Sequence, residues 1–397
     1  MAVENWVSRH LDELISFRRD LHAHPELLYD VDRTAGRVAQ ALHAAGVDEV
    51  ATGIGRTGVA GVIRGATATS GRAIGLRADM DALPVSEETG AAWASTKPGL
   101  MHACGHDGHT TMLLGAARHL AENRTFDGTV VLIFQPAEEG GAGARAMIED
   151  GLFERFPVDE VYGLHNKPNL PLGHFAIAPG PVMGSVDEIR IRVRGVGGHA
   201  AFPHNTVDPI PVTGAMIQAL QTVVSRNLDP LKSAVVSITS LHGGDAFNVI
   251  PTEVALNGTV RTLDAQVRDM VENRLGAAVA GIASAFGCAA DLDYVRHYPV
   301  TVNDADGTAR AAEAAMAVAG TQQVATDLTP SLGGEDFAFM LEQVPGAIIF
   351  AGNGAGPGLH HPAYDFNDEL IPWGCSYWTR LVGQRLPPKT NTEKQNP

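Results

Sequence analysis

Two kinds of apolar pattern follow one another along this chain, and the change between them near residue 186 constrains the fold most. Short unbroken apolar runs, alternating with helical periods, come first: 58–63, 73–76, 129–134 and 161–164. Unbroken runs are typical of strands covered on both faces, so they predict an α/β domain with flanking helices on a mostly parallel sheet. From Ile189 to Arg194, apolar and charged residues alternate strictly. This alternation predicts a strand with one face in water.

The alternating strand opens a second structural unit. Helices are expected near 208–226 and 265–286, and further strands near 233–241, 253–261 and 289–296. This order of strands and helices is that of a ferredoxin-like α+β unit. The first pattern then returns, with helices at 307–319 and 335–343 and a strand at 347–352. We therefore expect a discontinuous catalytic α/β domain (1–183 and 298–388), an inserted lid and dimerisation domain (184–297) and a disordered tail (389–397).

The acidic balance of the chain bears on its partners. With 29 basic and 45 acidic side chains, the net charge is −16, which argues against nucleic acid or an anionic membrane and favours a small-molecule substrate. The three cysteines are widely separated, a pattern that suits a reducing compartment. The N-terminal segment is charged throughout, and no apolar run approaches the roughly 20 residues of a membrane helix. These features predict a cytoplasmic protein.

Candidate metal ligands stand at the ends of several predicted strands. The segment MHACGHDGHT (101–110) holds three histidines, one cysteine and one aspartate. Because the carboxyl ends of parallel strands meet at one edge of a sheet, side chains that follow different strands are expected to converge there. The residues that follow the strands are Glu138, Glu139, His165, His360 and His361. Such convergence is what a metal site needs, since rigid elements must hold deprotonated ligands together.

Each of these residues also has a simpler explanation. A lone histidine at a strand end is usually a hydrogen-bonded structural residue, and paired glutamates in a loop are usually solvated. Cys104 offers a third alternative, because a thiolate with His106 or His109 as its base would make a thiol amidase. The residues alone leave these alternatives open.

The motifs MHACGHDGHT, FQPAEEG, GLHNKP, GGHAAFPH, SRNLDP, FNVIP, GTVRTLD, GGEDFA and HHPAYDFND occur in this order. Together they resemble the motifs of the hippurate hydrolase and N-acyl-amino-acid amidohydrolase family, a branch of the dinuclear metallopeptidases related to carboxypeptidase G and the aminoacylases. The resemblance runs from the DLHAHPEL segment near residue 20 to Tyr377. MHACGHD combined with FQPAEEG is its most specific part.

The resemblance implies two divalent metal ions per subunit, with ligands from five residues: Cys104, His106, Glu139, His165 and His360. It places the Cys104 thiolate between the two ions and makes Glu138 the general base. His361 is the alternative to its neighbour His360. One thiolate, three imidazoles and one carboxylate suit Zn, Mn, Co or Ni.

Four more acidic residues belong to these motifs. In sibling branches a histidine ligand stands where this chain has Asp79, so we expect Asp79 and Asp81 to orient the ligands instead. Glu335 and Asp336, in GGEDFA, are expected beside the metal pocket without an assigned role.

Three residues of the inserted domain complete the expected site. From the residues alone, His199 is a turn histidine. The resemblance implies instead that it enters the partner subunit's site and stabilises the oxyanion, which requires a homodimer or a dimer-based oligomer. Asn248 and Arg261 are expected to face the substrate, with the planar guanidinium holding a carboxylate. A structural role for either residue stays open.

We therefore expect metal-dependent hydrolysis of the amide bond of N-acyl or N-aroyl amino acids, such as hippurate. A dipeptidase or an N-acetyl-amino-acid deacetylase is the alternative within the same superfamily. A non-catalytic binder that kept the fold would lack ligands or the general base, and all of them are present.

Overall fold

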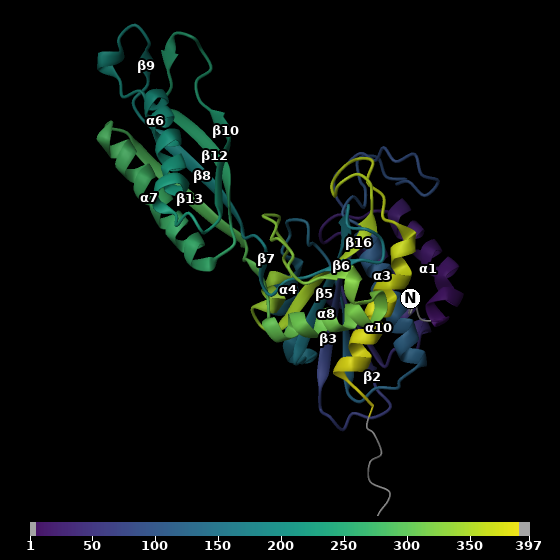
Figure 1. Cartoon of the computed structure of the whole chain (residues 1–397). Helices are drawn as coiled ribbons and strands as arrows, with labels where there is room; N and C mark the ends of the chain where they lie inside the picture. The colour runs from purple at the N-terminus through teal and green to yellow at the C-terminus, as the bar shows by residue number, and fades with distance from the viewer. Residues whose placement is uncertain (1–4, 389–397) are drawn as a thin grey trace, which may run out of the picture. The chain divides into compact units, whose positions relative to one another are not determined.

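The computed structural model describes residues 5–388 and divides the chain into two compact units (Figure 1). Within the described residues, the first unit comprises 5–180, 302–329 and 336–388, and the second comprises Pro181–Thr301 and Pro330–Glu335. The predicted tail, 389–397, lies outside the described residues. The predicted fold class, a mostly parallel α/β sheet with a separate sheet-rich domain, is confirmed.

An eight-stranded sheet forms the centre of the first unit, in the order β1-β2-β4-β3-β5-β16-β6-β15. The strands are β1 (Glu49–Ile54), β2 (Gly58–Arg64), β3 (Ala73–Asp79), β4 (Thr129–Gln135), β5 (Glu160–Pro168), β6 (Phe175–Ala176), β15 (Val324–Ala325) and β16 (Gly346–Gly354). The four central strands β4, β3, β5 and β16 are parallel. Both β1 and β2 are antiparallel to their neighbours. The carboxyl ends of β3, β4, β5 and β16 therefore share one edge.

Helices cover this sheet: α1 (Asn5–Ala23), α2 (Asp32–Ala44), α3 (His106–Glu122), α4 (Gly143–Glu149), α5 (Leu152–Arg155), α8 (Ala305–Ala319), α9 (Ala338–Leu341) and α10 (Ile371–Arg385). Figure 1 shows α1, α3 and α10 together, and one buried core joins Leu14 of α1, Leu113 of α3 and Trp378 of α10. The helix predicted at 335–343 forms only from Ala338, because Asp336 is used in side-chain and backbone contacts described below. Among the described residues, no helix is both long enough and apolar enough to cross a membrane.

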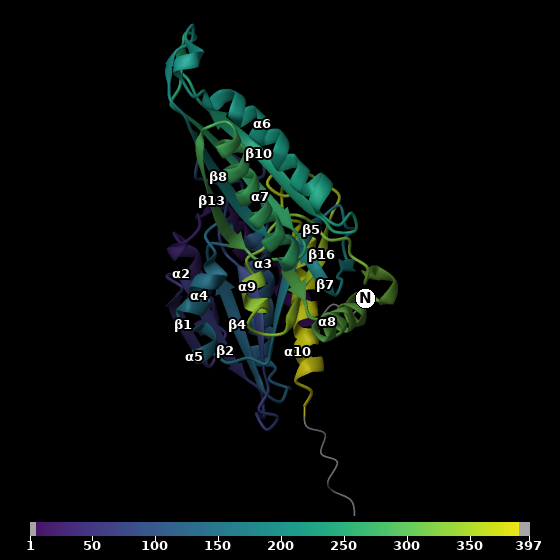
Figure 2. The ribbon, with the colours of Figure 1, turned by 90° about the vertical axis from the view of Figure 1, so that its left-hand side faces the viewer.

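The second unit has a four-stranded antiparallel sheet in the order β10-β12-β8-β13. Its main elements are β8 (Val186–Arg194), α6 (Pro209–Thr222), β10 (Ala234–His242), β12 (Glu253–Thr262), α7 (Ala265–Ala285) and β13 (Ala289–Tyr298). Ile189, Ile191 and Val193 are buried beneath α6 and α7, which cover one face of the sheet in Figures 1 and 2. This is the ferredoxin-like order that the strict alternation predicted.

Short strands complete the chain. They are β7 (Gly180–Met183) with β14 (Thr301–Asn303), and β9 (Gly198–His199) with β11 (Val249–Ile250). A π-helical turn, Val223–Asn227, follows α6.

Candidate metal centre

The five predicted ligands come together in the first unit as two overlapping groups of three. One group is Cys104, His106 and His165, and the other is Cys104, Glu139 and His360. Within each group the potential ligand atoms lie within 4.8 Å of one another. Cys104 belongs to both groups, which is the arrangement that a bridging thiolate requires.

A tight turn places Cys104 and His106 on the same side of the chain. Gly105 between them has φ 92° and directly precedes α3. A Cβ at this position would lie 2.4 Å from Nδ2 of Asn166, and that Nδ2 donates a 2.6 Å hydrogen bond to the carbonyl of Cys104. Glycine is needed here both for its left-handed conformation and for the close approach of Asn166.

Backbone carbonyls orient the two buried histidines. Nδ1 of His106 donates to the carbonyl of Asp81 at 2.8 Å, and Nδ1 of His165 donates to the carbonyl of Asn166 at 2.7 Å. In each ring this leaves Nε2 as the nitrogen with a free lone pair. Nε2 of His165 lies 3.5 Å from Sγ of Cys104. Nε2 of His106 is buried without a hydrogen-bond partner among the described residues.

Asp81 holds the loop that carries the two glutamates. Its carboxylate accepts the backbone N–H of Glu138 at 2.9 Å and that of Glu139 at 3.1 Å. Ala137, just before them, has φ 54°, a left-handed conformation that is costly for a residue with a Cβ. The structure therefore gives Asp81 the orienting position that the sequence suggested.

His360 reaches the cluster from the loop after β16. Its own φ is 66°, and its backbone N–H donates to the carbonyl of Ala103 at 2.8 Å. Nε2 of His360 lies 3.3 Å from Oε1 of Glu139, without hydrogen-bond geometry. His361 instead accepts the backbone N–H of Ala363 through Nδ1 at 3.0 Å. Of the two adjacent histidines, the structure brings His360 to the cluster.

His109 lies beside the cluster, but both of its ring nitrogens are occupied. Nδ1 donates to Oδ1 of Asp79 at 2.6 Å, and Nε2 accepts the backbone N–H of Asn166 at 3.0 Å. Asp79 is further held by Arg77 at 2.7 Å. His109 and Asp79 therefore support the cluster by hydrogen bonds, and His109 has no free ring nitrogen with which to bind a metal.

The negative charges around the cluster favour binding of a cation. Burial by itself lowers the pKa of His106, but the carboxylates of Asp79, Asp81 and Glu139 raise it to about 10. Burial, together with Glu139 and Glu138, raises the pKa of Cys104 well above its ordinary value. A site that binds protons this strongly without metal is one where a divalent cation can replace them. The thiol, imidazole and carboxylate donors suit Zn, Mn, Co or Ni, so the residues present fit a metal centre.

The same charges argue against the thiol amidase. Burial lowers the pKa of His165, the histidine next to the sulfur, well below its ordinary value. With the pKa of Cys104 raised, the sulfur stays a neutral thiol. An activated nucleophile requires the opposite shift. Of the two bases considered from the sequence, His109 already uses both ring nitrogens, and His106 directs Nδ1 to the carbonyl of Asp81.

Glu138 is held beside the ligands without belonging to either group of three. It is 7% exposed, and its Oε1 lies 3.4 Å from the backbone N–H of Asp336, which donates to it. The Asp336 carboxylate accepts from Arg77 at 3.1 Å and from Gln135 at 2.7 Å. Asp336, unassigned from sequence, thus anchors the chain next to Glu138. Glu335 belongs to the second unit.

His199, Asn248 and Arg261 all lie in the second unit. His199 pairs with Val249 in the β9–β11 sheet, and the Asn248 carbonyl accepts the N–H of Ala200 at 3.0 Å. His199 and Asn248 therefore stand together on exposed chain. Arg261 lies on β12 opposite Val235, and its Nη1 donates to the hydroxyl of Thr259 and to the carbonyl of Val260. Their predicted roles at the site stay predictions.

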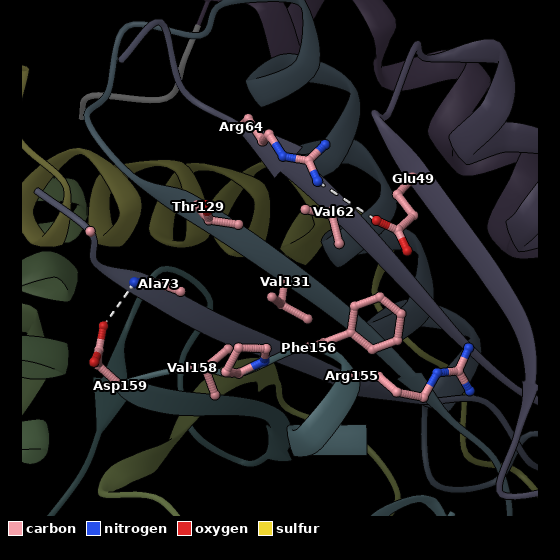
Figure 3. A pocket seen from close by; sticks show the side chains of 12 residues that line it. Glu49, Val62, Arg64, Ala73, Thr129, Val131, Arg155, Phe156, Val158 and Asp159 are labelled. Atoms are coloured by element: carbon pink, nitrogen blue, oxygen red, sulfur yellow. Dashed lines mark hydrogen bonds and ion pairs between the residues drawn. The ribbon is translucent and has the colours of Figure 1, made fainter. Parts of the chain in front are cut away.

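A cavity of about 350 Å³ lies elsewhere in the first unit (Figure 3). It includes Ala73 and Thr129, the first residues of β3 and β4, whereas the metal cluster lies beyond the other ends of these strands. Its lining combines apolar side chains with two arginines, Arg64 and Arg155, and two carboxylates, Glu49 and Asp159, and it holds no histidine or cysteine. It therefore lacks the thiol and imidazole donors of the metal cluster.

Comparison with known proteins agrees with the motifs. A family model described as peptidase family M20/M25/M40 matches residues 75–384. An N-acetyl-L-cysteine deacetylase of Bacillus subtilis (strain 168) is 43% identical over 375 residues, which cover 94% of this chain and 88% of the relative. A hippurate hydrolase of Campylobacter jejuni is 43% identical over 370 residues, covering 93% of this chain and 96% of the relative.

A solved structure supports the same assignment. The crystal structure of a dinuclear metal-binding peptidase of the M20 family from Bacillus subtilis shares 36% identity with this chain. Its TM-score is 0.83, and the match covers 96% of this chain and 99% of that structure. The predicted resemblance and the expectation of an amidohydrolase are confirmed. The chain belongs to peptidase family M20/M25/M40.

Proposed function

We propose that this amidohydrolase binds two divalent ions per subunit and cleaves the amide bond of N-acyl or N-aroyl amino acids, releasing a carboxylic acid and a free amino acid. The observation that carries the proposal is the pair of ligand groups that share Cys104, with Glu138 beside them. We assign Cys104, His106, Glu139, His165 and His360 as the ligands. Zn, Mn, Co and Ni are the metals that this donor set suits.

The residues around the ligands explain how an amide would be cleaved. When bound, the two ions supply an activated water and a polarised substrate carbonyl. Glu138 takes the proton of the attacking water on its carboxylate and passes it to the departing nitrogen, acting first as base and then as acid. Asp81 and Asp336 keep this carboxylate in place through the backbone contacts of its loop.

The second unit supplies the remaining parts of the proposal. His199 donates a hydrogen bond to the oxyanion in the partner subunit's site, and Arg261 with Asn248 binds the substrate. Exposed apolar side chains surround His199: Phe202 is 53% exposed, Phe247 101% and Val249 52%. Patches of this kind are typical of surfaces that contact another protein. The strand β10 also lies at an open edge of its sheet. Both features support a homodimer formed through this unit.

A second function has a specific observation in its favour. The N-acetyl-L-cysteine deacetylase is as similar to this chain as the hippurate hydrolase, at 43% identity. Removal of a small acetyl group is therefore the alternative, and a dipeptidase is the third.

A substrate panel on metal-defined protein tests these proposals. Purified protein is stripped with a chelator, its metal content is measured, and it is reloaded separately with Zn, Mn, Co or Ni. Hydrolysis of N-benzoylglycine, N-acetylcysteine and a dipeptide is then compared for each form. We expect no turnover in the stripped form and fastest turnover of N-benzoylglycine after reloading, whereas fastest turnover of N-acetylcysteine favours the deacetylase. Activity that survives complete removal of metal contradicts the metal mechanism, and preference for the dipeptide contradicts the substrate class.

A further inference from the structure

A buried charged cluster on α1 lies outside everything assigned so far. Arg18 and His22 are one helical turn apart on the buried face of α1, and both are 0% exposed. They belong to the N-terminal segment that precedes the region matched by the family model, 75–384. Neither residue is in a candidate ligand group. A fully buried arginine is costly unless several partners use its charge.

One set of partners is on the segment that carries Cys104 and His106. Asp107 directly follows His106 in the first turn of α3. Its Oδ2 is 2.9 Å from Nδ1 of His22 and 3.3 Å from Nη1 of Arg18. The first turn of α3, from which His106 projects, is thereby tied to α1.

The other partners are on the segment that carries His360. Nε of Arg18 donates to Asp368 at 2.8 Å, and Nη1 lies 3.3 Å from Asp365. Both aspartates lie between His360 and α10. One guanidinium therefore contacts carboxylates on both ligand-bearing segments. These segments are far apart in sequence but supply ligands to the same metal pair.

The loop that carries His360 depends on these contacts with Arg18 for its position. The His360 side chain is 53% exposed, so packing does not fix it. Its left-handed backbone, at φ 66°, is held only as firmly as the loop around it. The Arg18 contacts to Asp365 and Asp368 are a direct restraint on that loop.

We propose that Arg18, supported by His22, is a positioning residue for metal binding. It fixes the segment of Cys104 and His106 relative to the segment of His360, so that the two ligand groups can fill together. The inference rests on the proposed function, because that function assigns the ligands. Arginine is needed for this role because its planar guanidinium has several N–H donors that can contact both segments at once. The ammonium of a lysine is a single point charge and cannot contact both segments in the same way.

Arg19 provides a matched control. It is the next residue of α1, its side chain is 38% exposed, and it contacts the same Asp368 at 2.8 Å. It also stacks on Trp93, with the guanidinium 3.5 Å from the ring centroid. It has no contact with Asp107, so Arg19 touches one ligand-bearing segment and Arg18 touches both.

The test is calorimetric titration of Zn²⁺ into chelator-stripped full-length protein, with thermal unfolding of each stripped variant measured alongside. We expect Arg18→Lys to bind at least one of the two ions about 10- to 100-fold more weakly, the usual effect of losing a group that orients a ligand. Arg19→Met is expected to bind both ions like the wild type. A lower unfolding temperature for Arg18→Lys with both Zn²⁺ affinities unchanged overturns the inference, because it shows a purely structural role.

Asp365→Asn gives a milder second variant if Arg18→Lys does not fold. The Asp365 side chain is 34% exposed and is only one of several partners of Arg18. We expect Asp365→Asn to weaken Zn²⁺ binding, but by less than Arg18→Lys does. Unchanged Zn²⁺ affinities for Asp365→Asn overturn the inference. If the wild type itself binds fewer than two ions, the proposed function fails and this inference with it. If the wild type binds two and the variants bind them equally well, only this inference fails.

Discussion

Nε2 of His106 and Oε1 of Glu139 face one another across 4.0 Å, and neither has a hydrogen-bond partner among the described residues. Buried polar atoms are rarely left unpaired, because each costs about 1–3 kcal/mol. A buried ring nitrogen and a buried carboxylate oxygen without partners each have a lone pair for a metal ion, and each belongs to one of the two ligand groups that share Cys104. The neighbouring supports are complete, since Asp81 binds both the ring of His106 and the backbone of Glu139. The space between Nε2 of His106 and Oε1 of Glu139 is therefore bounded by residues that hydrogen bonds hold in place.

The two adjacent glutamates should separate into two roles. We expect Glu138→Gln to keep both metal ions and lose about 10²- to 10⁴-fold in kcat, because the amide cannot take a proton from water. Glu139→Gln should instead lose metal, since a neutral amide replaces a charged ligand. Metal content by elemental analysis and kcat on the preferred substrate measure the two effects. A Glu138→Gln protein with full metal and near wild-type turnover would refute the assignment of the base.

The turn at Gly105 should tolerate no side chain. In Gly105→Ala the left-handed conformation alone costs about 1–2 kcal/mol, and the added Cβ meets Asn166, which supports Cys104. We expect a lower free energy of unfolding together with weaker metal binding. Gly36→Ala, inside α2 with open space around it, is the control and should be neutral or slightly stabilising. Denaturant unfolding of the stripped proteins gives the comparison, and equal stability of Gly105→Ala and wild type would contradict it.

Much of the framework was predictable because burial imposes periodic patterns. Unbroken runs marked β2 to β5, and the alternation of Ile189, Ile191 and Val193 marked the change of sheet type. The antiparallel edge was not predictable: β1 has a mixed exposure pattern and gives no clear period. The helix expected from 335 begins only at Ala338, because Asp336 uses its backbone N–H and carboxylate in long-range contacts that sequence does not reveal.

Part of the candidate site could likewise be predicted from the sequence, and part of it could not. The approach of Glu139, His165 and His360 to one another could be expected from strand ends, since parallel strands deliver residues to one edge, and the resemblance added Cys104 and His106. The exclusion of His109 could not be foreseen, because it depends on Asp79 and on the backbone of Asn166 occupying both ring nitrogens. The sequence does not reveal Arg18 for a related reason. On an amphipathic helix an arginine is expected to face water, and only its three-dimensional partners reveal that it is buried.

His22 should make the stability of the stripped protein depend on pH. Burial lowers its pKa, but attraction to Asp107 and hydrogen bonds to Asp107 and Glu87 outweigh this and raise it to about 9. Because the folded pKa is raised, the protonated ring stabilises the fold fully below pH 6.5, and this contribution is lost as the pH rises through about 9. A rise of this size corresponds to about 3 kcal/mol at most.

We therefore expect His22→Gln to be less stable than the wild type at pH 6, with the difference shrinking between pH 6.5 and 9 and largely gone at pH 10. Chemical denaturation of stripped protein across this range measures it. His24→Gln is the control on the same helix end, where the side chain is 39% exposed and contacts Asp20. A destabilisation by His22→Gln that is the same at pH 6 and pH 10 would show that the ring acts by packing alone.

The role of His199 is best tested by mixing two inactive proteins. If His199 serves the partner's site, a dimer of one His199→Ala subunit and one Glu138→Gln subunit contains one complete site, with Glu138 from the first subunit and His199 from the second. Random reassociation of equal amounts gives about half mixed dimers, so roughly a quarter of wild-type activity should return. If His199 served the site of its own subunit, every site in the mixture would lack one of the two groups.

The mixture is made by mild denaturation and refolding together, and activity is followed against each variant refolded alone. A second mixture extends the test to the apolar surface around His199. It combines the His199→Ala protein with a double variant that carries both Glu138→Gln and Phe247→Ala. Phe247 is chosen because it is fully exposed in the single chain. If that surface joins the subunits, the added substitution should reduce the recovered activity by weakening the mixed dimer. No recovery in the first mixture, with dimers present by sedimentation, would place His199 outside the partner's site and leave its turn as a structural feature of β9.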